Sequence, residues 1–361
     1  MAQLTVAHSS QSLDVPVSLA LPVILPNIST SLDGTGFLFG SGTSYEAGYP
    51  MITGLTKSVV SGLNSSEREE LDRVLDQNSL EYDESEGIPN IETIADIVIS
   101  HQIQTGDQRL TQLETRFHDL ILDCILSVEH PNLENHVSFF EKLKSRSFGN
   151  PCSVWIFTTN YDLLFEQSAA YAGVTIENAF CGSTTRFFNP DALSYTSGQI
   201  SSSKTFQPNR DLIVKLVKLH GSISWYQDNT RFFESHPKAL NSINRRAMIM
   251  PRKKKIMETL DGPYKALFSI ASRIIGTKCK YLSSCGFSFS DEHINDNIIL
   301  PAIKSNRCKM FILSKEKLEN MNEVCKQQNV NAGYENSLCI DGRNIDGGTD
   351  LWAFSNFVKI F

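Results

Sequence analysis

The chain has 361 residues, and its 33 Lys and Arg residues against 40 Asp and Glu residues give a formal net charge of −7. Hydrophobic residues make up 41% of the chain and charged residues 20%, a composition that excludes a disordered or fibrous protein. The acidic balance argues against a protein that coats nucleic acid through bulk charge, although a local basic patch is compatible with it.

The 8 cysteines are scattered, and no two are spaced as in CxxC, so neither a redox pair nor a paired-CxxC zinc site is predicted. Scattered cysteines in a large chain are typical of reduced core thiols.

The N-terminal MAQLTVAHSS lacks the positive stretch of a secretory signal. The apolar run 17–25 is far shorter than the roughly 20 residues of a transmembrane helix. We therefore expect a soluble, cytoplasmic protein without membrane contact.

The first part of the chain is predicted to hold one strand and a block of helices. Residues 1–30 are rich in Ser and Pro and are expected to form an irregular arm with at most one short strand, either a flexible tail or an oligomer-forming arm. TGFLF at 35–39 predicts a buried strand, followed by a glycine turn and a helix start in GSGTSYEAGYP. Helical spacing of apolar residues then predicts a helical block at 55–148.

The rest of the chain is predicted to alternate strands with helices. Strands are expected at 153–159, 211–219, 279–286 and 308–313, and helices at 161–173, with Gly173 as a C-cap, and at 264–276. This alternation predicts an α/β fold with a mostly parallel sheet, whose functional residues lie just beyond the carboxyl ends of the strands. The Gly-, Asn- and Asp-rich stretch 333–349 is predicted to be a loop, and the final SNFVKIF a strand or a subunit contact.

Three predicted strand ends carry unusual residues. In GSGTS at 40–44, glycines would let backbone amides approach a diphosphate at a helix N-terminus, or would simply form a tight turn. In TTNYD at 158–162, Asn160 can bind a sugar hydroxyl or hold a water, or it can cap a helix, as Asp162 can. In KLHGS, His220 can act as a general base near neutral pH, or it can be a satisfied loop residue.

In this order, GSGTSYEAGYP, TTNYD and LHGS resemble the sirtuin family, which reads GxG-S-xx-AG-x-P, then T-x-N-x-D, then HG. A fourth segment, CGFSFSDEHIN at 285–295, resembles the G-[YF]-S-F-x-D-x-H-I-N segment of bacterial sirtuin-like proteins of anti-phage defence. The resemblance runs from about residue 35 to 315. It implies a Rossmann-like parallel sheet with helices on both faces, formed by 31–54 and 149–361, with 55–148 as an inserted helical subdomain.

The resemblance implies NAD+ as the substrate and gives roles to individual residues. Asn160 would contact the nicotinamide-side ribose and position water, and His220 would act as general base. The other residues implied in NAD+ binding are Gly40, Ser41, Gly42, Thr43, Ser44 and Gly48 around the pyrophosphate, Thr159 and Asp162 beside Asn160, and Gly286, Phe287 and Ser288 at the adenosine half. Asp291 and Asn295 would bind the adenine-side ribose or, equally, stabilise their loop and cap the next helix. For Asp162, capping of the helix that follows is the favoured role.

The implied function is NAD+ hydrolysis to nicotinamide and ADP-ribose, which depletes cellular NAD+ in anti-phage defence by abortive infection. Enzymes of this kind are usually held inactive until triggered, often within a homo-oligomer. The resemblance also implies a complex with a co-encoded hexameric translocase-type ATPase, and contact with DNA through that complex.

Two alternative functions stay open. One is a non-catalytic or nuclease-associated subunit of such a complex, and the other is a protein deacylase or ADP-ribosyltransferase. The deacylase is disfavoured because deacylating sirtuins carry a four-cysteine zinc module after the HG motif, whereas only Cys279 and Cys285 lie between Ser222 and Gly286 here. No zinc is therefore predicted.

A basic run could contact nucleic acid or a partner, although a solvated loop is favoured; it comprises Arg245, Arg246, Arg252, Lys253, Lys254 and Lys255.

Overall fold

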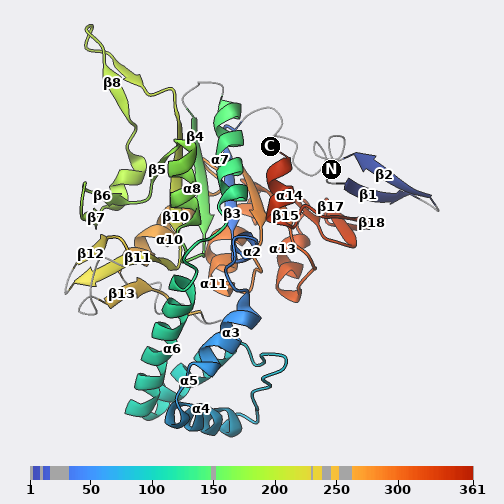
Figure 1. Cartoon of the computed structure of the whole chain (residues 1–361). Coiled ribbons are helices and arrows are strands. Elements are labelled where there is room, and N and C mark those ends of the chain that lie inside the picture. Colours follow the sequence, from blue (N-terminus) through green and yellow to red (C-terminus); the bar gives the residue numbers. More distant parts are fainter. Residues whose placement is uncertain are drawn as a thin grey trace.

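The computed structural model describes residues 3–8, 11–16, 32–147, 152–228, 231–237, 245–251 and 262–360. Its main element is an 11-stranded sheet in the order β2-β1-β18-β17-β16-β15-β14-β3-β4-β10-β5 (Figure 1). The parallel part contains β16 (Val330–Gly333), β15 (Lys309–Leu313), β14 (Tyr281–Cys285), β3 (Thr35–Phe39), β4 (Cys152–Thr158), β10 (Leu212–Lys218) and β5 (Thr175–Glu177). These bounds confirm the predicted strands. Fully buried runs such as LIVKLVK in β10 are typical of a parallel sheet that is covered on both faces.

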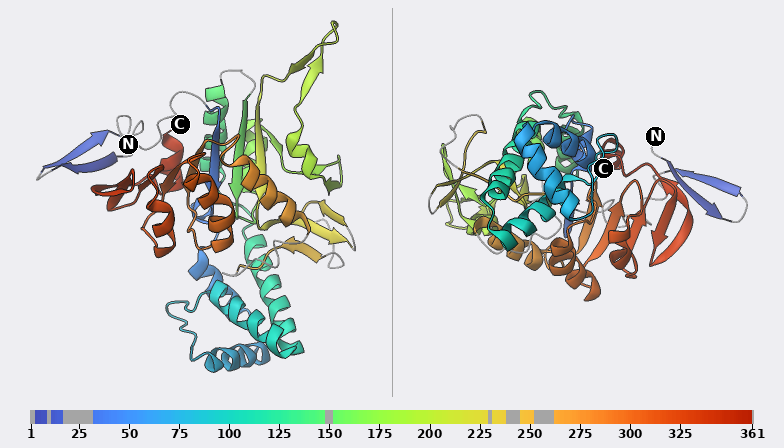
Figure 2. Two further views of the ribbon diagram at one scale, coloured as in Figure 1. Left: turned by 180° about the vertical axis from the view of Figure 1, so that it is seen from behind. Right: turned by 90° about the horizontal axis from the view of Figure 1, so that it is seen from below.

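Helices cover both faces of this sheet, which confirms the predicted Rossmann-like α/β fold. Side chains alternate along each strand, so Phe37 and Phe39 of β3 point to one face and Leu38 to the other. The first face packs against α7 (Glu134–Ser147), α8 (Leu164–Ala172) and α14 (Phe354–Lys359). The opposite face, in front in the reverse view of Figure 2, packs against α10 (Gly262–Ile274), α11 (Glu292–Ile294), the π-helical η2 (Asn295–Ile299), α12 (Leu300–Lys304), the 3₁₀ turn η3 (Glu319–Met321) and α13 (Asn322–Cys325).

One prediction about the end of the chain is wrong, and so is the strand alternative for its last residues. The stretch 333–349 is not a loop, because β17 (Ser337–Ile340) and β18 (Arg343–Thr349) form a hairpin that lies between β16 and β1 in the main sheet. Its two-residue turn, Asp341-Gly342, has positive φ at both residues (49° and 74°), and Asp-Gly is a preferred sequence for such turns. The final SNFVKIF is not a strand either, because its residues up to Lys359 form α14. The aromatic side chains of α14, Phe354 and Phe357, are buried against the sheet.

The described parts of the N-terminal arm hold two strands, β1 (Gln3–His8) and β2 (Gln11–Pro16), instead of at most one. They form an antiparallel pair that adds to β18 at the sheet edge. The predicted apolar run 17–25 lies outside the described residues.

A group of helices projects from the end of the sheet where the parallel strands finish (Figure 1). It consists of α3 (Ile52–Ser61), α4 (Ser65–Gln77), α5 (Ile91–Thr105) and α6 (Gln108–Leu126), which share a core of their own. α5 and α6 are separate helices because Gly106 ends α5 in the left-handed conformation. The predicted insertion 55–148 also contains α7, which packs on the sheet beside α8 and α14 and not with this group.

A second, 5-stranded sheet follows the main sheet directly. Its order is β13 (Arg245–Met248), β11 (Gly221–Asp228), β12 (Arg231–Glu234), β7 (Arg186–Phe188) and β6 (Phe180–Cys181). Only Leu219 and His220 separate β10 from β11, so His220 sits where the two sheets meet. The segment between β7 and β10 holds η1 (Pro190–Ser194) and the projecting hairpin of β8 (Gly198–Ile200) and β9 (Phe206–Pro208) (Figure 1). No helix among the described residues is long and apolar enough to cross a membrane.

Candidate functional site

A cavity of about 140 Å³ lies beyond the carboxyl ends of β3, β4, β10 and β14. Because one water needs only about 10–15 Å³ of such space, the cavity has room for part of an organic ligand. Its sheet wall consists of Gly40, Ser41, Ser44, Thr159, Asn160, Tyr161, Asp162, His220, Phe287, Ser288, Ser290 and Asp291. Its helical wall consists of Tyr49, Pro50, Ile52, Leu55, Glu92 and Ile125, and Pro251 completes the lining. The strand ends singled out in the sequence therefore meet at one place.

Five predicted site residues do not line this cavity, namely Gly42, Thr43, Gly48, Gly286 and Asn295. Thr43 Oγ1 donates to the Gly40 carbonyl and accepts from Asn160, so it supports residues that do line the cavity. Asn295 begins η2, and its Nδ2 donates to the Phe289 carbonyl at 2.7 Å.

Hydrogen bonds donated by its nitrogen hold the side-chain amide of Asn160 in place. Nδ2 donates to the Gly40 carbonyl at 3.0 Å, to Thr43 Oγ1 at 3.2 Å and to Ser44 Oγ at 2.9 Å. Oδ1 is buried and has no hydrogen-bond partner, although the residue borders the cavity. A buried acceptor without a partner is costly unless a ligand or water satisfies it. Helix capping does not explain Asn160, because α8 begins only at Leu164.

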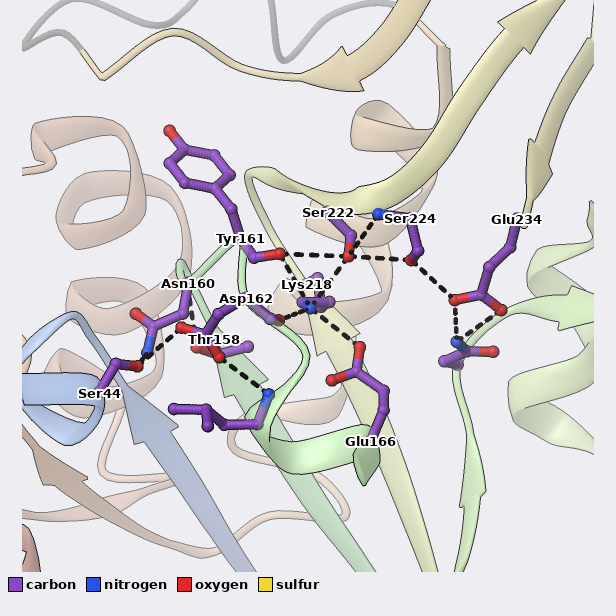
Figure 3. Close-up of polar contacts among 12 residues, drawn as sticks. Ser44, Thr158, Asn160, Tyr161, Asp162, Glu166, Lys218, Ser222, Ser224 and Glu234 are labelled. Atoms are coloured by element: carbon purple, nitrogen blue, oxygen red, sulfur yellow. Dashed lines mark hydrogen bonds and ion pairs between the residues drawn. The ribbon is translucent and has the colours of Figure 1, made fainter. Parts of the chain in front are cut away.

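Asp162 has a structural role and also contacts the site. Its Oδ1 accepts the backbone N–H of Leu164 at 3.0 Å, which satisfies an amide at the start of α8, although the N-cap residue itself is Leu163. Its Oδ2 accepts the hydroxyl of Ser44 at 2.7 Å (Figure 3). Since Ser44 also accepts from Asn160, the loop after β4 is tied to the turn after β3.

His220 pairs with Asp291, a contact that sequence reasoning missed. His220 Nε2 lies 2.8 Å from Asp291 Oδ2, and both residues are buried. An ionised Asp291 only accepts hydrogen bonds, so this contact favours the His220 tautomer that carries its proton on Nε2. Asp291 also caps α11, since Oδ1 accepts the N–H of Ile294 at 3.1 Å. The predicted loop-stabilising and capping role of Asp291 is thus present, together with a second role beside His220.

The glycines of two strand ends are required by a close backbone contact. A Cβ on Gly42 would lie 2.6 Å from Gly286 Cα, and one on Gly40 would lie 2.6 Å from the Gly286 carbonyl oxygen. The turns after β3 and β14 therefore touch, and the Gly42 N–H donates to the Gly286 carbonyl at 3.0 Å. The tight-turn interpretation accounts for these glycines without a diphosphate. Gly221 has φ of 87°, and a Cβ there would lie 2.2 Å from the Ala247 carbonyl, which explains the glycine after His220.

The resemblance implies that the inserted helical block covers the NAD+ site, but no residue of this helical wall was predicted individually. Its apolar residues come from several helices: Ile52 and Leu55 lie on α3, and Ile125 lies on α6. Tyr49 adds a hydroxyl, and its pKa is raised by burial and then by the negative charges of Asp162 and Glu166. Tyr49 therefore remains a protonated hydrogen-bond donor at neutral pH.

Within the basic run, Arg246 is a structural residue. Its guanidinium donates to the carbonyls of Ile223 and Pro237 and lies 4.1 Å from the ring centroid of Tyr226. Burial lowers the pKa of Arg246. The solvated-loop interpretation is therefore wrong for this residue. Residues 252–255 lie outside the described part of the chain.

All 8 cysteines are unpaired. Within the described ranges, no group of three or more His, Cys, Asp and Glu side chains is arranged to hold a metal ion. The absence of zinc remains a prediction from the cysteine pattern.

The sequence of residues 154–332, just under half of the chain, matches the SIR2-like domain family. The match supports a sirtuin-like family and an NAD-related enzyme. It runs from β4 into β16, so it contains Asn160, His220 and Asp291, whereas the glycine turn after β3 lies outside it. No curated protein sequence matches the chain significantly.

Proposed function

We propose that this protein is an NAD+ hydrolase that cleaves the bond between nicotinamide and ribose. The observation that carries the proposal is the meeting of Asn160 with the His220–Asp291 pair in one cavity, inside the SIR2-like segment. A buried histidine with an oriented ring and a fixed amide that borders the same cavity can together orient and deprotonate one water molecule.

The lining of the cavity fits NAD+ as substrate. Asn160 Oδ1 is a buried acceptor without a protein partner, which suits a ribose hydroxyl or the attacking water. The sheet wall offers further hydroxyl groups from Ser41 and Ser288, whereas Ile52, Leu55 and Ile125 of the helical wall offer apolar surface for an aromatic ring. Small-molecule sites typically combine apolar walls with a few oriented polar groups.

The chemistry follows from these groups. Bound NAD+ supplies a glycosidic bond to a cationic nicotinamide ring, which leaves as a neutral molecule with the bonding electron pair. His220 accepts a proton from the attacking water as the water oxygen bonds to the anomeric carbon. Asp291 holds the ring orientation and stabilises the imidazolium that forms. The positively charged sugar of the transition state is of the oxocarbenium type common to glycoside cleavage.

The finer parts of the proposal rest on the resemblance of residues 285–295 and on the cysteines. We propose NAD+ depletion during anti-phage defence, in the cytoplasm, within a homo-oligomer or a complex with a co-encoded translocase-type ATPase. The unpaired cysteines are compatible with a reducing compartment. Hydrolysis is favoured over deacylation because the chain lacks the cysteines for the zinc module of deacylases.

The test is nicotinamide release from NAD+ by the purified full chain, alone and with its co-encoded partner, followed by chromatography. Asn160→Ala and His220→Ala are expected to lower the rate at least about 100-fold each. His130→Ala, an exposed histidine outside the cavity, is the matched control. Release retained in both site variants would overturn the site, and release that requires an acylated lysine peptide would favour a deacylase.

A further inference from the structure

A lysine ammonium is buried directly behind the candidate site. Lys218 ends β10 and is only 1% exposed. Its Nζ lies 2.9 Å from Glu166 Oε1 and 3.1 Å from Ser222 Oγ (Figure 3). It also donates to the carbonyl of Asp162 and lies 3.5 Å from that of Tyr161. A buried charge is costly unless it is paired and hydrogen-bonded, and this one is both.

The carbonyls bound by Lys218 belong to the loop that presents Asn160. The loop runs from β4 to α8, and it contains Asn160, Tyr161 and Asp162. Asp162 continues the connection, because its Oδ2 accepts the hydroxyl of Ser44 at 2.7 Å, and Ser44 accepts from Asn160 Nδ2 at 2.9 Å. A short chain of hydrogen bonds therefore runs from the ammonium to the amide that borders the cavity.

On its other side the ammonium is anchored to the second sheet. Ser222 Oγ lies 3.1 Å from Ser224 Oγ, and Ser224 donates to Glu234 Oε1 at 3.3 Å. Asn178 donates to the same carboxylate at 3.0 Å. Burial raises the pKa of Glu166, whereas the charge of Lys218 opposes that rise. The ammonium thus joins β10, the first turn of α8 and the start of β11 at one point.

We propose that Lys218 is a positioning residue: its ammonium fixes the loop carbonyls of Tyr161 and Asp162 and thereby holds Asn160 in its reactive orientation. The kinetic part of this inference rests on the proposed NAD+ hydrolysis. The competing explanation is a purely structural ion pair between Lys218 and Glu166, which would act only on the amount of folded protein.

Two variants separate these explanations. Glu166→Gln removes the charge partner but leaves the ammonium on the loop carbonyls. Lys218→Met/Glu166→Leu removes both charges together, which avoids the unpaired carboxylate that Lys218→Met alone would leave in the interior. Positioning predicts kcat within about 3-fold of wild type for Glu166→Gln. It predicts a kcat loss of at least about 10-fold, with little change in KM, for the folded double variant, because small displacements at a reacting centre are costly.

A second readout is independent of catalysis. Amide hydrogen exchange is expected to rise in residues 160–164 of the double variant, whereas residues 154–158 of β4 remain as protected as in wild type. Wild-type kcat and wild-type exchange in the folded double variant would overturn the inference. So would a kcat loss of at least about 10-fold in Glu166→Gln, and this result decides the question if the double variant does not fold. If the wild-type protein releases no nicotinamide, the proposed function fails, and the exchange of residues 160–164 alone tests the positioning.

Discussion

The two walls of the cavity differ in chemistry and in the way the chain builds them. The sheet wall is polar, and its residues stand at strand ends that a parallel sheet brings to one edge. The helical wall is mostly apolar, with Ile52, Leu55 and Ile125 contributed by helices that have their own core. This difference indicates a division of labour. Under the proposed function, the sheet wall carries the His220–Asp291 pair that would take up the proton, and the apolar side chains of the helical wall would supply binding surface and restrict water.

The largest effect should come from the charge beside His220. Asp291→Asn is expected to lower kcat for nicotinamide release about 1,000-fold, or about 4 kcal/mol in activation free energy, because the amide cannot stabilise the imidazolium. Asn is as good a helix N-cap as Asp, so the capping contact to Ile294 should survive. The measurement is steady-state kinetics together with urea unfolding.

The matched control for this substitution is Asp123→Asn, which changes an exposed carboxylate of α6 outside the cavity. An unchanged kcat in folded Asp291→Asn would mean that His220 needs no carboxylate partner. The sheet wall would then lose the feature that most distinguishes it from the helical wall.

The next largest effect concerns the backbone of the sheet wall. Gly42→Ala is expected to lower the free energy of unfolding by about 2 kcal/mol, because the new Cβ would lie 2.6 Å from Gly286 Cα and force the two turns apart. Gly42 lies in the helical conformation of α2 (Gly42–Tyr45), so its backbone angles would accept alanine and only the contact forbids it. Wild-type stability of this variant would show that the two turns are free to separate.

Much of the sheet wall could be predicted from sequence because its signals are local. β3 was predicted at 35–39 from a short apolar run, and Asn160 and His220 were found because each follows such a run. The partnership of His220 with Asp291 spans 71 residues and depends on how loops meet in space, so no local pattern reveals it. The hairpin at 337–349 was missed because its glycine-rich composition outweighed the Asp-Gly turn signal.

The individual residues of the helical wall could not be predicted for a different reason. Leu55 and Ile125 recur at helical spacing, as core residues do, and nothing in the sequence separates an apolar side chain that borders a cavity from one inside a bundle. Lys218 was equally hidden. The sequence does not indicate which groups the ammonium of Lys218 contacts, because its acceptors lie on other elements.

A moderate effect is expected from truncating the helical wall. Leu55→Ala should raise KM for NAD+ about 10-fold with kcat nearly unchanged, because lost apolar contact weakens ground state and transition state alike. Ile103→Ala, 72% exposed on α5 of the same helical group, is the matched control. A fall in kcat at constant KM would instead place the helical wall in the chemical step and remove the proposed division of labour.

The smallest effect should be a gain in stability on the helical side. Gly54 is exposed on α3 and does not line the cavity. A Cβ there would lie 3.4 Å from Pro50 Cβ, an ordinary contact, in contrast to Gly42. Gly54→Ala should therefore raise the free energy of unfolding by about 0.5–1 kcal/mol through helix propensity, seen as a higher urea midpoint at constant slope. If kcat/KM fell while stability rose, α3 would have to flex during turnover, because neither space nor backbone angle requires glycine at this position.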